Sequence, residues 1–236
     1  DGAKLDAGVR AGYVFNTTIA GIEQADACLI IGSNPRVEAP ILNARLRKRA
    51  GAGGFRVGVV GENADLTFRT EHLGAGPQTL KEIADGSHAF CEVLNAAKRP
   101  MLILGQGALS RSDGAAVLAA ARQIAGNTGM VSADWNGFNV LHMAAGRVAG
   151  LELGLVPQNG GRDVAGILDG AASGDIEAVY LLGADEIDTS KLANAFVVYQ
   201  GHHGDAGAHV ADVILPGAAY TEKDGTYANT EGRAQR

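Results

Sequence analysis

Short apolar runs, most of them closed by a glycine, recur along this chain, and each is followed by a polar turn or an alanine-rich stretch. Runs of this length without polar alternation are typical of strands that are buried on both faces, as in parallel sheets. This pattern constrains the fold more than any other feature. The predicted strands cover residues 26–32, 55–61, 100–105, 129–133, 177–183, 196–201 and 212–217.

Stretches with helical periodicity separate these runs, so the succession predicts a doubly wound α/β fold with mostly parallel sheets of Rossmann-like units. The 34 glycines in 236 residues suit many tight strand-to-helix turns. Residues 62–99 lack clear strand character, which places a predicted boundary between a first unit, 1–98, and a second unit, 99–236. The predicted helices cover residues 39–50, 87–98, 112–126, 138–151 and 161–173.

Composition disfavours several classes of function. The net charge is −6, aromatic residues make up 5%, and no basic stripe is present, so nucleic acid is a poor partner. No apolar run approaches the roughly 20 residues of a membrane-spanning helix, so we expect no direct membrane insertion. Two cysteines cannot hold an ordinary iron–sulfur cluster. Both ends look cut, and we expect this chain to be a piece of a longer polypeptide.

A G-x-G pattern at Gly105 and Gly107 follows a predicted strand and opens a helix, as in dinucleotide-binding sites. Ser110 occupies the place of the third glycine, and no acidic residue ends the next strand at the offset that a ribose contact needs. The alternative is an ordinary turn, with Ser112 and Asp113 capping the helix.

Three histidines and an aspartate gather on one loop: His202, His203, Asp205 and His209. Imidazole and carboxylate are metal ligands, but adjacent residues rarely converge on one ion. The alternative is a tight loop whose histidines donate to backbone carbonyls. We therefore expect no metal site.

Neither cysteine has the setting of a nucleophile. His88 and Cys91 share a helix face, which is a conceivable base and nucleophile, but Cys91 belongs to the apolar stripe of that helix. Cys28 lies within a predicted strand. Both are interpreted as small core hydrophobes, and no catalytic residue is predicted.

The turn "GSNPR" differs, because it combines a strand end with a helix start. Gly32 closes the strand, Ser33 and Asn34 are predicted to cap backbone donors, and Pro35 fixes the turn. The N–H groups of the following helix point to the carboxyl edge of the sheet, where anionic ligands bind in such folds. The turn is therefore an anion cradle or simply a good helix start.

Residues 32–48 and 199–235 resemble the family of large iron–sulfur subunits of proton-pumping NADH:quinone oxidoreductase, respiratory complex I. The resemblance extends to residues 15–26, 65–74 and 111–121. It covers the C-terminal part of that subunit, which is similar to molybdopterin-dependent oxidoreductases such as formate dehydrogenases. The resemblance thus implies a molybdopterin-oxidoreductase-like fold.

In those oxidoreductases a G-x-N-P turn and an E-K-x-G-T-x-x-N-T-E segment approach the pterin cofactor. The resemblance implies that the matching residues here are remnants of a pterin pocket, kept for folding and subunit packing, with no cofactor in this chain. The tail should then lie near residues 32–36, with its charged side chains, including Arg233, partnered to protein groups. The remnant residues are Gly32, Ser33, Asn34, Pro35, Glu222, Lys223, Thr226 and Asn229.

The function implied is a catalytically silent structural and interaction region of a subunit that passes electrons from NADH towards quinone. The parent subunit would carry 2Fe–2S and 4Fe–4S clusters in its N-terminal part and contact other subunits of the peripheral arm. It would sit on the cytoplasmic side of a bacterial inner membrane or on the mitochondrial matrix side. The alternatives are part of an active, formate dehydrogenase-like molybdopterin enzyme and a stand-alone dinucleotide-binding domain.

Overall fold

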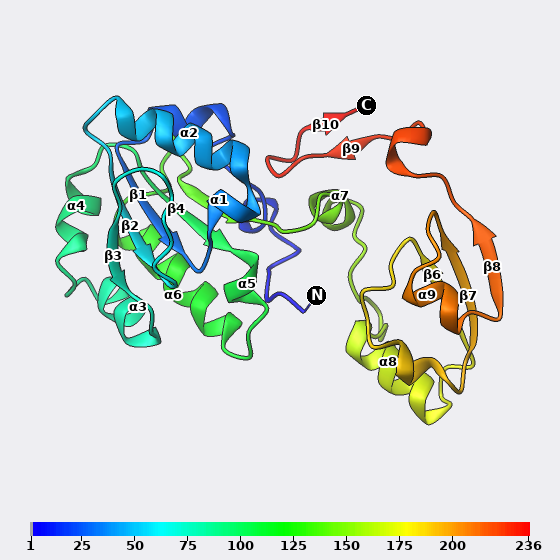
Figure 1. The fold of residues 1–236 in the computed structure, drawn as a ribbon. Coiled ribbons are helices and arrows are strands. Elements are labelled where there is room, and N and C mark those ends of the chain that lie inside the picture. The colour runs from blue at the N-terminus through cyan, green and yellow to red at the C-terminus, as the bar shows by residue number, and fades with distance from the viewer. Residues whose placement is uncertain (1) are drawn as a thin grey trace. The chain divides into compact units, whose positions relative to one another are not determined.

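A computed structural model describes residues 2–236 and divides the chain into two compact units. The first comprises the chain up to Leu155 together with Tyr227–Gln235, and the second comprises Val156–Thr226 and Arg236. The end of the chain therefore returns to the first unit after the second is complete (Figure 1). Among the described residues, none of the helices has the length and apolar character that crossing a bilayer requires.

A five-stranded parallel sheet forms the centre of the first unit, in the order β3-β2-β1-β4-β5. Its central strands are buried apolar runs, which is the pattern that the sequence predicts. The chain winds from β1 to one edge and then returns to the other, so the direction reverses between β1 and β4. The strands are β1 (Ala27–Ile31), β2 (Arg56–Val60), β3 (Glu71–Gly74), β4 (Pro100–Gly105) and β5 (Phe138–Leu141).

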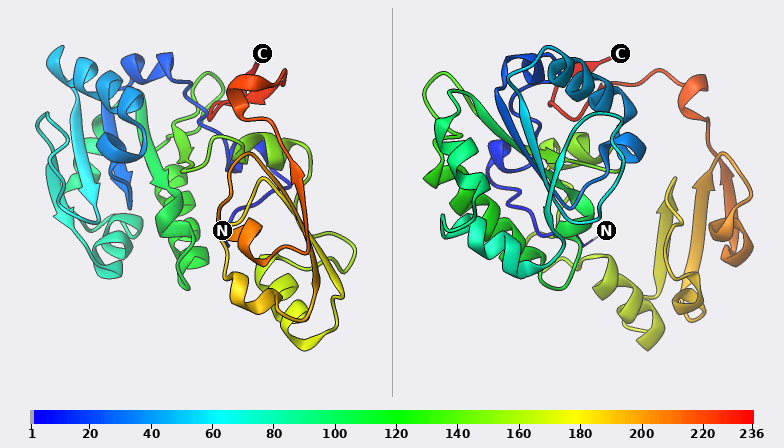
Figure 2. Two further views of the ribbon diagram at one scale, coloured as in Figure 1. Left: turned by 45° about the vertical axis from the view of Figure 1, so that its right-hand side comes forward. Right: turned by 60° about the vertical axis from the view of Figure 1, so that its left-hand side comes forward.

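Helices cover both faces of this sheet, which confirms the doubly wound fold. One face packs against α3, α4 and α6, and the other packs against α2 and η2. The right-hand view of Figure 2 shows α6 in green and α2 in blue on opposite sides of the strands. The helices of this unit are η1 (Arg10–Gly12), η2 (Ala20–Gln24), α1 (Pro35–Glu38), α2 (Pro40–Gly51), α3 (Pro77–Ala84), α4 (Phe90–Ala96), α5 (Gln106–Leu109), α6 (Gly114–Asn127) and α7 (Arg147–Glu152).

The second unit contains a three-stranded parallel sheet in the order β6-β7-β8. Its helices α8, η3 and α9 supply one apolar cluster with one face of the sheet. The elements are α8 (Val164–Ser173), β6 (Ala178–Leu182), η3 (Thr189–Leu192), β7 (Phe196–Gly201), α9 (Ala206–Val210), β8 (Val213–Pro216) and η4 (Tyr220–Glu222). A short antiparallel hairpin, β9 (Tyr227–Ala228) and β10 (Ala234–Gln235), ends the chain.

The structure corrects three expectations. The strand predicted at 129–133 is only an isolated bridge between Val131 and Asn136. The helix predicted at 138–151 begins instead as β5, because residues 138–141 pair in parallel with β4, and the Asn139 side chain adds hydrogen bonds to the Leu102 and Gly137 carbonyls. The boundary predicted after residue 98 does not separate the units, since β4 pairs with β1 inside one sheet.

Candidate functional site

The turn after β1 is held by an acidic side chain from α1. The Glu38 carboxylate accepts a hydrogen bond from the Ser33 hydroxyl at 2.9 Å and another from the Asn34 backbone N–H at 2.7 Å. The expectation that Ser33 and Asn34 cap backbone donors is therefore wrong, since the Asn34 side chain makes no capping bond. Glu38, four residues after Asn34, reaches back to the helix start, as the glutamate of a capping box does.

The turn after β4 packs directly on the turn after β1. A Cβ atom built on Gly105 would lie 2.2 Å from the Gly32 carbonyl oxygen and 2.8 Å from the Ser33 Cβ atom. Gly32 has a φ of 57°, and a Cβ there would lie 2.6 Å from that of Ala108. The Cβ position of Gly107, in contrast, has no neighbour within 4 Å. The first glycine of the G-x-G pattern, Gly105, is thus needed for the close contact between the two turns.

These two turns occupy the topological switch point between β1 and β4, where doubly wound folds bind ligands. An anionic pterin or nucleotide at this point would need free backbone and hydroxyl donors. Here the Asn34 N–H and the Ser33 hydroxyl already donate to Glu38, and the Gly32 N–H donates to the Val60 carbonyl at 2.8 Å. The buried Asn34 Oδ1 has no partner among the described groups, but an acceptor does not attract a phosphate. The residues present do not fit an anionic cofactor.

The C-terminal hairpin is shaped by Asn229. Its side-chain oxygen accepts hydrogen bonds from the Glu231 N–H at 3.2 Å and the Arg233 N–H at 2.9 Å, which closes the turn between β9 and β10. Asparagine side chains favour such turns because they bind backbone donors two or more residues ahead. The Asn229 side chain is therefore engaged in hydrogen bonds that hold the hairpin turn.

Glu231 ties this hairpin to the N-terminal segment, residues 10–19. Its side chain is 7% exposed, accepts a hydrogen bond from the Ile19 N–H at 2.7 Å and pairs with the Arg233 guanidinium at 3.1 Å. Ile19 stands at the start of η2, where a negative charge is favourable. Beside it, the Thr230 carbonyl accepts from the Phe15 N–H at 2.8 Å.

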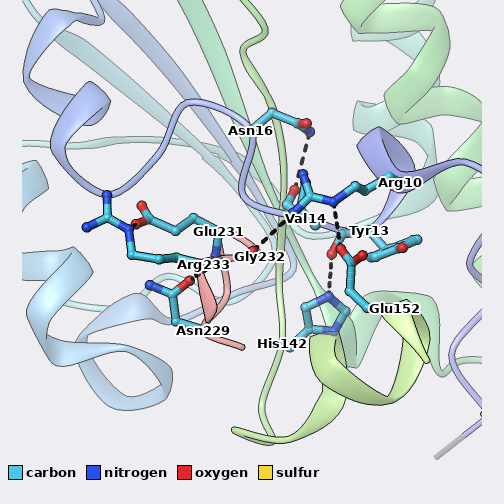
Figure 3. A network of polar contacts seen from close by, with 10 residues as sticks. All are labelled: Arg10, Tyr13, Val14, Asn16, His142, Glu152, Asn229, Glu231, Gly232 and Arg233. Carbon is cyan, nitrogen blue, oxygen red and sulfur yellow. Dashed lines mark hydrogen bonds and ion pairs between the residues drawn. The ribbon is translucent and has the colours of Figure 1, made fainter. Parts of the chain in front are cut away.

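Arg10 joins the same hairpin to α7, as Figure 3 shows. Its Nε lies 2.6 Å from the Glu152 carboxylate, and its Nη2 donates to the Gly232 carbonyl at 3.1 Å. Segments separated by 142 and 222 residues in sequence thus meet on one side chain. We call the contacts of Arg10, Phe15 and Ile19 with Glu152 and the 229–233 turn the terminal clamp.

His142 lies buried beside the terminal clamp, with its Nε2 donating to the Tyr13 carbonyl at 2.5 Å (Figure 3). Burial, and secondarily the charge of Arg147, lower the pKa of His142 while the bond to Tyr13 opposes this. Because a carbonyl oxygen can only accept, Nε2 carries the proton of this hydrogen bond. His142 is therefore a buried structural histidine at the edge of the core rather than an exposed acid or base.

The predicted remnant residues are divided between the two units. Gly32, Ser33, Asn34, Pro35 and Asn229 belong to the first, and the remaining three, Glu222, Lys223 and Thr226, belong to the second.

The tail contacts differ from those expected. The long-range hydrogen bonds of the hairpin go to Arg10, Phe15 and Ile19 rather than to residues 32–36. The Glu222 carboxylate accepts from the nearby Ala219 N–H at 3.0 Å, and Arg233 pairs with Glu231. The tail is thus partly a second-unit segment and partly a clamp on the first unit's N-terminal segment.

The histidine loop does not converge on one point. The His202 and His203 rings have centroids 4.4 Å apart, with their planes tilted by 55° rather than stacked, and the Tyr199 hydroxyl donates to the His203 carbonyl. Within residues 2–236, no three His, Cys, Asp or Glu side chains are grouped to hold a metal ion.

The cysteines are core residues. Cys28 and Cys91 lie in opposite apolar clusters of the first unit, and burial raises the pKa of both thiols. The Cys91 thiol donates to the Ile83 carbonyl at 3.4 Å, while the His88 ring accepts from the Phe90 N–H. The conceivable pair of base and nucleophile is therefore not formed.

Sequence reasoning missed Glu38, Glu231, Arg10, Glu152 and His142. The sequence did contain a local indication of the role of Glu38, because an acidic side chain four positions after Asn34 can reach back to the backbone N–H at the helix start. The ion pair of Arg10 with Glu152 has no signal in a single sequence, since neither residue has a pattern that names its partner.

Comparison with known proteins gives consistent matches along the chain. The profile of the family described as Molybdopterin oxidoreductase matches residues 2–236. The mitochondrial NADH dehydrogenase (ubiquinone) iron-sulfur protein 1 of Solanum tuberosum is 49% identical over 236 residues, which are 100% of this chain and 31% of that protein.

Two further relatives are similar to nearly the whole chain. An NADH-quinone oxidoreductase subunit of Rickettsia bellii is 47% identical over 232 residues, covering 98% of this chain and 32% of that protein. The NADH-ubiquinone oxidoreductase 75 kDa subunit of Reclinomonas americana is 45% identical over 232 residues, covering 98% and 33%. The chain spans about a third of the length of the curated relatives it matches.

Proposed function

This chain belongs to the molybdopterin oxidoreductase family, and from that premise we propose that it is a catalytically silent structural region of the large iron–sulfur subunit of NADH:quinone oxidoreductase. The observation that carries the proposal is similarity of 45–49% identity over 98–100% of the chain to subunits of that complex. These relatives also favour this function over a formate dehydrogenase-like enzyme.

The parent subunit, in this proposal, passes electrons from NADH towards quinone through 2Fe–2S and 4Fe–4S clusters held outside this chain. Two buried cysteines in separate core clusters cannot supply the thiolates of a cluster. The partners are the other subunits of the peripheral arm. The subunit sits on the cytoplasmic side of a bacterial inner membrane or on the mitochondrial matrix side.

The remnant residues do not act on a cofactor in this proposal. Glu38 occupies the donors of the turn after β1, and contact between Gly105 and Gly32 closes the two turns on each other. A carboxylate fixed at this place also repels an anion electrostatically. We therefore infer no catalytic step through a pterin.

The residues of this chain contribute shape instead. The terminal clamp fastens the 229–233 turn to the N-terminal segment and to α7, so the chain that leaves the first unit after Leu155 is tied back at Tyr227. Both connections of the second unit therefore begin and end in the first unit.

The experiment compares Glu38→Ala with Glu62→Ala, an exposed glutamate, in the assembled complex. We measure NADH:quinone turnover per assembled complex and the amount of complex on native gels. Glu38→Ala is expected to lower the amount of complex while turnover per complex stays equal to that of Glu62→Ala. A fall in turnover per complex at constant assembly would contradict the silent role.

Elemental analysis of the purified 236-residue chain supplies the second test. We expect no stoichiometric iron, zinc or molybdenum. Molybdenum at one atom per chain would favour the molybdopterin enzyme instead.

A further inference from the structure

In the three-stranded sheet of the second unit, β6 and β7 have one covered face and one open face, whereas β8 is exposed on both faces, since Ile214 beside Tyr199 is 58% exposed. Leu181, Val197 and Tyr199 point into the apolar cluster beneath α8, η3 and α9 and are buried. Because successive strand residues point to opposite faces, their neighbours lie on the other side. On that side Tyr180 and Phe196 are each 52% exposed, and Leu182 is 67% exposed.

Strand register aligns the open-face side chains into a continuous apolar surface. Ala178 pairs with Phe196, Tyr180 with Val198 and Val213, and Leu182 with Gln200 and Leu215. None of the residues in these rows is charged. The polar groups of this surface, the Tyr180 hydroxyl and the Gln200 side-chain amide, form a hydrogen bond with each other, in which the Tyr180 hydroxyl donates to the Gln200 side-chain oxygen. We call these eight residues the open sheet face.

An open face of this kind is unusual for a parallel sheet. Parallel sheets occur almost only with both faces covered, because their crossover helices pack on them. Here the order β6-β7-β8 advances in one direction, so right-handed crossovers place η3 and α9 on the same face. The opposite face can gain a layer only from chain outside these three strands.

We propose that the open sheet face is covered by amphipathic helices of the parent subunit, from the part of that polypeptide that lies outside this chain. This proposal rests on the proposed function, because it takes that subunit as the partner. It completes a sheet between two helical layers, as already present in the first unit.

The length of the relatives identifies this occupant. Residues matching this chain make up 31–33% of those proteins, so about two thirds of each lies outside the match. A segment of the same polypeptide meets the open sheet face at a high effective concentration, which a separate protein does not. The uncharged rows suit the apolar stripe of a helix rather than a charged surface.

The test is thiol labelling at position 182. Leu182→Cys is placed in the 236-residue chain and in the full-length subunit, and its rate of reaction with a maleimide is measured in both. In the 236-residue chain background labelling is low because Cys28 and Cys91 are buried, and in the full-length subunit the protein without the introduced cysteine supplies the background to subtract. Ser173→Cys is the matched control, since Ser173 is exposed at the end of α8 in the same unit.

The introduced thiol at position 182 is expected to react at least about tenfold more slowly in the full-length subunit than in the 236-residue chain, as local protection predicts. The control should change by less than about threefold. Equal rates at position 182 in both proteins would overturn the proposal. Slow labelling of position 182 already in the 236-residue chain would also overturn the proposal. If that slow labelling depended on protein concentration, a second copy of the chain would cover the surface, and if it did not, the first unit would.

Protection that arises only in the assembled complex would assign the surface to another subunit and overturn the proposal as stated. The second variant, Leu182→Glu, is expected to leave the isolated chain folded, because Leu182 is 67% exposed there, and to reduce soluble full-length subunit several-fold relative to Ser173→Glu. NADH:quinone turnover is measured in the same preparations. If the complex turns over while position 182 remains accessible to the maleimide, only this inference is wrong. If the chain is absent from any such complex, the proposed function is wrong.

Discussion

Removing the Glu231 carboxylate should loosen the terminal clamp and destabilise the first unit. Glu231→Ala deletes a partly buried, charge-assisted hydrogen bond to the Ile19 N–H at 2.7 Å. Such bonds contribute about 1.5–3 kcal/mol. The ion pair with Arg233 adds only about 0–1 kcal/mol, because the arginine side chain is largely exposed. The expected loss is therefore about 2–3 kcal/mol, with about 1 kcal/mol for Glu231→Gln, which keeps an acceptor oxygen.

The assay is urea unfolding followed by the fluorescence of Trp135, the single tryptophan and a core residue of the first unit. With a slope of about 2 kcal/mol per molar urea, the alanine variant should lower the midpoint by about 1 M. Glu222→Ala is the matched control, because Glu222 also accepts one backbone hydrogen bond but is exposed. It should move the midpoint by less than about 0.3 M.

Equal midpoints for Glu231→Ala and Glu222→Ala would refute the clamp as a stabilising contact. A change of slope without a change of midpoint would indicate that the hairpin detaches before the first unit unfolds. Glu231→Gln separates the two causes, since a loss as large as that of alanine would assign the effect to charge rather than to the acceptor.

The same assay tests three further predictions. Gly105→Ala, whose Cβ would lie 2.2 Å from a backbone oxygen, should cost about 2–3 kcal/mol, whereas Gly107→Ala should be neutral or stabilising by up to about 1 kcal/mol; equal effects would deny the contact between turns. Burial lowers the pKa of His142 in the folded state, so the unfolded chain binds a proton more readily than the folded one. The contribution of His142 to the free energy of unfolding should therefore be fully present above pH about 6.5 and be lost as the pH falls below that value. His142→Gln should flatten this pH dependence, and an unchanged dependence would exclude His142 as its cause. Glu38→Ala should cost about 1–2 kcal/mol and Asn34→Ala less than about 0.5 kcal/mol, and the reverse order would restore Asn34 as the cap.

The strands and helices with strong local patterns were predictable. Runs such as Ala27–Ile31 and Pro100–Gly105 are buried on both faces, so every residue is apolar or small, and the sequence predicts them directly. The strand β3 was missed, because Glu71–Gly74 is a partly exposed edge strand with no apolar run. The strand β5 was mistaken for a helix start, because four apolar-rich residues fit both periods.

At the candidate site, the sequence indicated the right stretches but assigned them the wrong partners. It directed attention to the 32–35 turn and to the polar tail, both of which carry structural hydrogen bonds. It placed the cap on Asn34 and the tail beside that turn. Side-chain partners depend on which backbone donors remain free after folding, and a residue type does not specify that.

The sequence by itself determined the class of fold, the order of its main elements and the family, because these follow from local periodicity and from contiguous motifs. Only the tertiary structure decided that the first unit is discontinuous and that Tyr227–Gln235 returns to it. It alone paired Thr230 with Phe15 and Glu231 with Ile19 across more than 200 residues. Such contacts form when the sheet brings distant segments together, and their free energy depends on burial and geometry that no local pattern encodes.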